Sequence, residues 1–189
     1  DGTVVRTIWG EMAWQLGYSR GGTKEAKKAF QRVAADDERA TSPGDAMRAL
    51  FNEYAPCLIL IDEWVAYARG LVSKDGLPGG DFGEQRSFAQ ALNAAVKATP
   101  GTALLVSLPA SEVRADDDTV SAHDIEIGGP RGREALDMLD HTITRDAYRW
   151  APAKPVESFE IVKRRLFREP DAAALTTIEQ VARRFTKFY

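Results

Sequence analysis

The sequence predicts an α/β protein in which a parallel sheet is flanked by helices and followed by a helical C-terminal segment. Two uninterrupted apolar runs, CLILI at 57–61 and TALLVSL at 102–108, predict strands that are buried on both faces. Around them, apolar residues recur at every third or fourth position, which is typical of amphipathic helices. We therefore expect an α/β core over residues 1–151 and the start of a helical subdomain over residues 152–189.

Three helices are predicted before the first strand. Apolar positions within 4–16 form one helical stripe, and Gly17 is the expected stop. The glycine-rich stretch 19–23 lacks the order G-x-x-x-x-G-K-[ST], so it does not predict a phosphate-binding loop. A second helix is expected over 24–35 and a short third one over 46–54.

The remaining elements follow from the same periodicity. Helices are predicted at 64–71, 87–98, 131–144, 155–167 and 172–189, with a mobile loop at 74–83 and a short edge strand at 148–150. In the helix 131–144 the residues expected to face inward are Ala135, Leu136, Leu139 and Ile143. In the last helix they are Ile178, Val181, Ala182 and Phe185.

Composition fits one globular domain, alone or with a small appendage. The 189 residues are 44% hydrophobic and 28% charged, and the single cysteine, Cys57, excludes an internal disulfide. No apolar run reaches the length of a membrane span, so we expect a cytoplasmic protein without a membrane partner. The net charge is −7 up to residue 144 and +4 from residue 145. This asymmetry is typical of solvated helix faces, with a nucleic-acid-binding patch as the alternative.

Two adjacent carboxylates, Asp62 and Glu63, follow the first predicted strand. In open α/β sheets, functional residues gather at the carboxyl ends of the strands. There Asp62 can hold Mg²⁺ through water, and Glu63 can orient or deprotonate an attacking water. Four apolar residues followed by Asp-Glu form the Walker B pattern of P-loop NTPases. The structural alternative is a helix-capping Asp62 with Glu63 in the first helical turn, and the pattern alone does not decide between them.

The order of elements adds a resemblance to this pattern. An apolar strand ends in Asp-Glu, a helix leads to a second apolar strand ending in Ser, and a helix, an arginine and a proline-started helical segment follow. This order resembles the second half of an AAA+ ATPase core and the beginning of its helical lid. The segments TIWGE, LILIDEWVAYAR, LLVSLPAS and EIGGPRGREALDML to FEIVKRRLF resemble one prokaryotic family of large AAA+ ATPases, often encoded beside DNA methyltransferases in anti-phage defence loci.

The resemblance implies roles for the polar residues at the strand ends. Asp62 corresponds to the residue on the Mg²⁺ side of ATP, and Glu63 to the catalytic carboxylate that polarises water. Ser107 or Ser111 corresponds to the sensor of the γ-phosphate. The alternative for either serine is a strand-to-loop cap.

Arginines beyond the second strand are the remaining candidates. Arg145 corresponds to the arginine finger that reaches a neighbouring subunit's nucleotide, where a fixed charge stabilises the transferring phosphoryl group. The alternative is a surface ion pair with Asp140 or Asp146. Arg133, after a Gly-Gly-Pro sequence, is a lesser candidate for contacting the nucleotide.

One departure from the family pattern bears on activity. The chain contains no glycine-rich phosphate loop, which the family carries before the segment that begins here at Asp1. We therefore expect the chain to need the missing N-terminal part of the same protein to bind ATP and Mg²⁺, and to be inactive alone. A homo-oligomer and a DNA or DNA-methyltransferase partner are also expected from the resemblance.

Two competing functions remain open from the sequence. In one, the fold is a non-catalytic scaffold whose Trp9, Trp14 and Trp64 serve a partner surface. In the other, the basic C-terminal segment binds nucleic acid, which predicts steep salt dependence. His123 is expected to be a surface histidine without a catalytic or metal-binding role.

Overall fold

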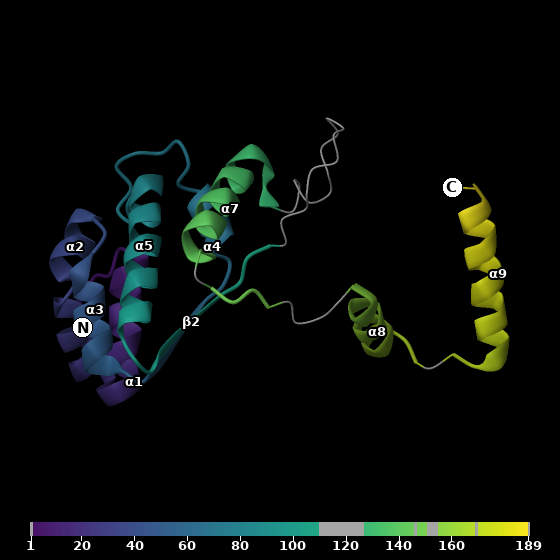
Figure 1. Ribbon diagram of the computed structural model, residues 1–189, viewed down its shortest axis with the longest axis horizontal. Helices are drawn as coiled ribbons and strands as arrows, with labels where there is room; N and C mark the ends of the chain where they lie inside the picture. Colours follow the sequence, from purple (N-terminus) through teal and green to yellow (C-terminus); the bar gives the residue numbers. More distant parts are fainter. Residues whose placement is uncertain (1, 110–126, 146, 151–154, 169, 189) are drawn as a thin grey trace. The chain divides into compact units, whose positions relative to one another are not determined.

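The computed structural model describes residues 2–109, 127–145, 147–150, 155–168 and 170–188. They form two compact units, Asp1–Ala147 and Tyr148–Tyr189 (Figure 1). The predicted candidates Ser111 and His123 lie outside the described residues. No described helix is both long enough and apolar enough to cross a membrane.

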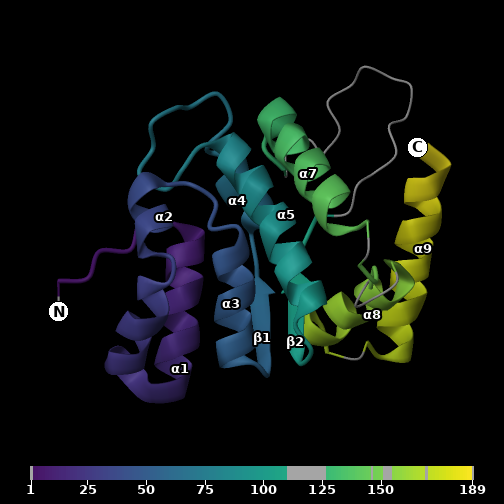
Figure 2. The same cartoon turned by 60° about the vertical axis from the view of Figure 1, so that its left-hand side comes forward.

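The first unit begins with a helical hairpin, α1 (Ile8–Gln31), which is interrupted at Gly21 and Gly22 (Figure 2). The predicted stop at Gly17 is therefore wrong by about one helical turn. Gly17 is buried where the two halves of α1 meet. A Cβ at this position would lie 2.5 Å from the carbonyl oxygen of Glu25, so the close approach requires glycine. Its small size serves close packing, and the reversal occurs at Gly22, where φ is +66°.

Helix α2 (Ala34–Arg39) and helix α3 (Asp45–Tyr54) complete the segment before the sheet. Helix α3 is tied to the second half of α1 by charged groups: Lys28 and Arg32 both pair with Glu53. The Tyr54 hydroxyl donates to Glu25 at 2.8 Å. These contacts fix the helix that delivers the chain to the first strand.

The two predicted strands pair in parallel. Strand β1 (Cys57–Ile61) lies beside β2 (Thr102–Val106), with Ile61 opposite Val106. The expectation that both faces are buried is wrong. Residues 58, 60, 103 and 105 are exposed, with 62% of Leu58 and 65% of Leu60 accessible, whereas Ile59 and Ile61 are buried in the core. Within this unit the helices cover one face of the sheet, so the strands alternate between core and solvent.

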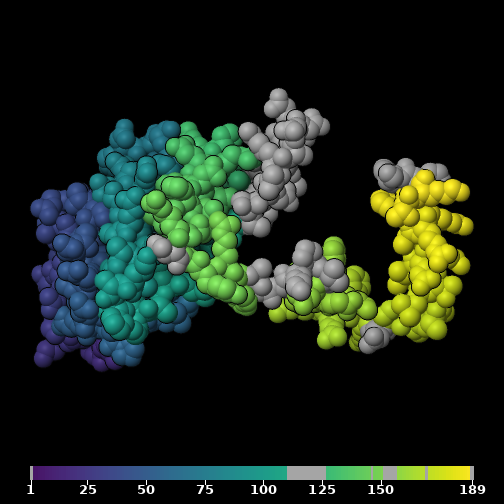
Figure 3. Space-filling view, in the orientation of Figure 1, coloured from purple at the N-terminus to yellow at the C-terminus, as the bar shows by residue number. Residues whose placement is uncertain are grey.

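Helix α4 (Trp64–Arg69), helix α5 (Phe82–Ala98) and helix α7 (Gly129–Ile143) complete the first unit. Helix α7 packs against both α4 and α5, and its side chains form a continuous surface with those of α5 in Figure 3. The four residues predicted to face inward on α7 are buried, which confirms that expectation.

An aromatic cluster lies at the centre of the first unit. Phe88 packs between Trp9 and Trp64, with ring centroids 5.3 and 5.8 Å away. Trp9 is 0% and Trp64 is 1% exposed. The scaffold hypothesis is therefore wrong in assigning these two tryptophans to a partner surface, because both belong to the core.

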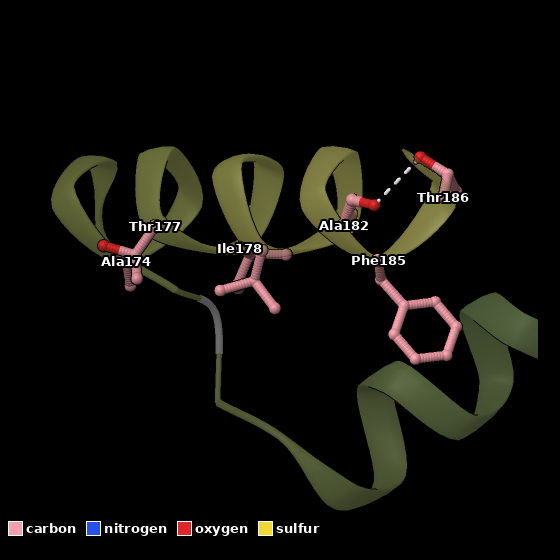
Figure 4. Close-up of a pocket in the computed structure, with 7 residues that line it drawn as sticks. Ala174, Thr177, Ile178, Ala182, Phe185 and Thr186 are labelled. Atoms are coloured by element: carbon pink, nitrogen blue, oxygen red, sulfur yellow. Dashed lines mark hydrogen bonds between the residues drawn. The ribbon is translucent and has the colours of Figure 1, made fainter. Parts of the chain in front are cut away.

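The second unit contains α8 (Pro155–Leu166) and α9 (Ala172–Phe188). No strand forms at 148–150, where Tyr148 and Trp150 are exposed. The predicted burial of Ile178, Val181 and Phe185 is also wrong, because each is more than half exposed. A hollow of about 670 Å³ at this face is lined by α9 alone, so it is one face of a helix and not an enclosed site (Figure 4).

Candidate functional site

The carboxyl ends of the two strands bring Asp62 and Ser107 together. The Ser107 amide donates to the carbonyl oxygen of Ile61 at 3.0 Å, which extends the parallel ladder by one residue. The Ser107 hydroxyl donates to Asp62 Oδ1. This contact follows from the register, because residues 62 and 107 come next after the paired Ile61 and Val106.

The two oxygens of the Asp62 carboxylate are in different environments. Oδ1 accepts from the Ser107 hydroxyl and from the Glu63 amide, the latter at 3.0 Å. Oδ2 has no hydrogen bond to any described residue, and the side chain is exposed. One oxygen thus holds the carboxylate in place while the other is open to a cation or to its bound water.

Glu63 has an unusual backbone conformation. It stands directly before α4 with φ +58° and ψ +23°, in the left-handed region that non-glycine residues avoid. Its side chain makes no capping hydrogen bond, and no ion pair joins it to another described residue. Such a conformation costs on the order of 1 kcal/mol, and residues held in this way cluster at functional sites.

This geometry differs from the structural alternative for Asp-Glu. In that alternative Asp62 caps the helix and Glu63 lies in its first turn, where its charge favours the helix dipole. In the structure Glu63 itself occupies the N-cap position, and Asp62 accepts from the Glu63 amide and from the Ser107 hydroxyl, not from an amide within the first turn of α4. The pair is therefore not explained as a helix cap.

A pocket of about 440 Å³ lies beside Asp62. Its lining comes from the segment before and at the start of α1, from the end of β1 and from α4: Val5, Arg6, Thr7, Ile8, Glu11, Ile61, Asp62, Trp64 and Tyr67. Burial raises the pKa of the Tyr67 phenol above its usual value, so this hydroxyl stays protonated at neutral pH. The lining thus combines apolar residues with acidic, basic and hydroxyl-bearing ones.

Asp37 fixes the wall of this pocket from inside the protein. Its carboxylate is fully buried and accepts from the Arg6 amide, from the Thr7 amide at 2.9 Å and from the Thr7 hydroxyl at 2.6 Å. The Thr7 hydroxyl oxygen in turn accepts from the Gly10 amide at 3.0 Å and caps α1. A Cβ on Gly10 would lie 2.2 Å from Asp37 Oδ1, so this position admits only glycine.

The arginine candidates lie elsewhere in the first unit. Arg133 is partly exposed on α7, and Arg145 is exposed just after that helix. Neither lines the pocket beside Asp62. Sequence reasoning also missed Arg6 and Asp37; the one available signal for Arg6 was its position directly before the Thr7 cap.

The carboxylates do not form a self-sufficient metal centre. Among the described residues, no group of three or more His, Cys, Asp or Glu side chains is arranged to hold a metal ion. Asp62 can therefore contribute one oxygen to a cation that takes its other ligands from water or from a bound substrate, as Mg²⁺ commonly does.

No family model, no curated protein and no solved structure matches the chain.

Proposed function

We propose that this chain supplies the Asp-Glu half of a Mg²⁺-dependent ATP-hydrolysing site in a cytoplasmic AAA+ protein. The observation that supports it most is the contact between Asp62 and Ser107 across two adjacent parallel strands. It unites a candidate metal-side carboxylate with a candidate phosphate sensor at one edge of the sheet, where α/β proteins bind nucleotides.

Each residue has a defined task in the proposed site. Asp62 holds Mg²⁺ through water with its open oxygen, while Ser107 fixes the other oxygen and senses the γ-phosphate. Glu63 orients and deprotonates the attacking water, and its carboxylate is exposed and unpaired among the described residues, as this role requires. The reaction is hydrolysis of ATP to ADP and phosphate.

The proposal requires a phosphate-binding segment from outside these residues. The 189 residues contain no G-x-x-x-x-G-K-[ST] sequence, so the loop must come from another part of a longer protein or from another chain. Arg145 is proposed as the finger that reaches a neighbouring copy in a homo-oligomer, with Arg133 as the lesser candidate. A DNA or DNA-methyltransferase partner belongs to the same proposal.

The test is ATP hydrolysis by the full-length natural protein with Glu63→Gln. The substitution keeps the size of the side chain and removes its charge. We expect turnover to fall by roughly 10²–10⁴-fold, which is the usual contribution of a general base, while MgATP still binds. Glu38→Gln, at an exposed position on α2, is the matched control and should leave turnover unchanged. Equal turnover in wild type and Glu63→Gln would exclude the proposed role.

A further inference from the structure

The pocket beside Asp62 is lined by an arginine, Arg6, to which the proposed function gives no role. Arg6 lines this pocket together with Asp62 and Glu11. An arginine and an aspartate that line one pocket suit a ligand that carries both signs of charge. A phosphate group with its bound Mg²⁺ is such a ligand, because the metal interacts with the carboxylate and the phosphate oxygens with arginine.

The backbone of Arg6 is held rigidly although its side chain is exposed. The Arg6 amide lies 3.1 Å from each oxygen of the buried Asp37 carboxylate, 31 residues away in the sequence. The next residue, Thr7, is bound to the same carboxylate through its amide and its hydroxyl. The backbone of Arg6 is therefore fixed beside the pocket before a ligand binds, so binding does not have to order this part of the main chain.

The guanidinium of Arg6 is not engaged within the described part of the chain. It forms no hydrogen bond or ion pair there, unlike Arg20, whose guanidinium donates to two carbonyl oxygens, and Arg69, which donates to Ile127. Those two arginines hold structural elements together. Arg6 does not, so its five N–H donors are available to a ligand.

We infer that Arg6 binds a phosphate oxygen of the nucleotide whose Mg²⁺ is held beside Asp62; this inference rests on the proposed function. The planar guanidinium makes two parallel hydrogen bonds to phosphate, and these are stronger than bonds between neutral groups. Because the contact exists with the bound substrate, its main effect is on substrate affinity. Asp37 is the positioning residue that sets the place of Arg6.

The experiment compares steady-state hydrolysis of MgATP by the full-length natural protein and its variants. Arg6→Gln removes the charge and spares the backbone bonds to Asp37. We expect KM to rise about 10-fold or more, as for loss of a charged hydrogen bond, with kcat changing far less. Arg6→Lys should recover part of the affinity as a point charge. Arg48→Gln, an exposed arginine on α3 that does not line the pocket, is the control.

The outcomes separate this inference from the proposed function. If Glu63→Gln abolishes turnover while Arg6→Gln keeps the wild-type KM, the Arg6 contact is refuted and the proposed function stands. If wild type neither binds nor hydrolyses MgATP, both are refuted. A rise in KM that also appears in Arg48→Gln reflects the overall electrostatic field of the protein. This outcome likewise refutes a specific contact between Arg6 and phosphate.

Discussion

The buried carboxylate of Asp37 gives the sharpest test of how the pocket wall is built. Asp37→Asn keeps the shape of the side chain but replaces one acceptor oxygen with an NH₂ group. Both Asp37 oxygens lie 3.1 Å from the Arg6 amide, and Oδ1 also receives both bonds from Thr7. In the variant the new NH₂ group therefore faces one of the N–H or O–H donors of Arg6 and Thr7, or one of these hydrogen bonds is broken.

The expected loss follows from the number and type of these bonds. A hydrogen bond to a charged group contributes about 1.5–3 kcal/mol, and one between neutral groups about 0.5–1.5 kcal/mol. Because Asp37 is 0% exposed, water does not replace what is lost. We expect the free energy of unfolding to fall by about 2–4 kcal/mol, which for a unit of this size lowers Tm by roughly 5–15 °C.

Urea unfolding of the 189-residue chain, followed by tryptophan fluorescence, measures this change because Trp9 is buried two residues after Thr7. The matched control is Asp36→Asn. Asp36 pairs with Arg39 at 3.3 Å at the surface, where an ion pair contributes at most about 1 kcal/mol. If Asp37→Asn and Asp36→Asn unfold at the same urea concentration, the Asp37 network does not anchor the N-terminal segment.

Three further predictions concern the rest of the first unit. Gly17→Ala places a methyl group 2.5 Å from the Glu25 carbonyl, so we expect a net loss of about 1–2 kcal/mol in urea unfolding; wild-type stability would contradict the hairpin packing. Glu63→Gly should raise stability by up to about 1 kcal/mol because glycine tolerates positive φ, whereas a loss would show that the left-handed backbone is not strained. Burial, followed by the hydrogen bond to Glu25, raises the pKa of Tyr54 to about 12. The folded state therefore resists ionisation, and stability is lost as the pH rises from about 10 to 12. Tyr54→Phe should remove this loss, as seen in urea unfolding at pH 9 and pH 11.5.

The two strands and the polar residues that follow them were predictable from local sequence. The apolar runs at 57–61 and 102–108 were long enough to identify β1 and β2, although β2 ends at Val106. Once two successive strands are separated by a helix, parallel pairing is the usual result, and it brings their carboxyl ends together. The meeting of Asp62 and Ser107 is a consequence of that rule and needed no knowledge of side-chain packing.

The errors come from effects that local patterns do not contain. An unbroken apolar run fits a strand buried on two faces, but how many layers cover the sheet depends on the whole assembly, and Leu58 and Leu60 are exposed. Gly17 looks like a helix stop because glycine often ends helices. Whether a glycine ends a helix or lets two helices approach depends on its distant neighbour, here Ala26, whose Cα would lie 2.7 Å from a Cβ at Gly17.

The same distinction separates the parts of the candidate site. Asp62 and Ser107 follow from strand register, but the position of Arg6 depends on Asp37, which is 31 residues away in the sequence. The left-handed backbone of Glu63 is likewise set by the turn from β1 into α4. The sequence could therefore name Asp62 and Glu63, while Arg6, which lines the pocket beside Asp62, is recognised only when the buried carboxylate of Asp37 is located. Because strand register places one part of the site and the Asp37 contacts place the other, the variants should have separable effects. Glu63→Gln should lower turnover, and Arg6→Gln should lower substrate affinity. Asp37→Asn should lower both the stability of the protein and its substrate affinity.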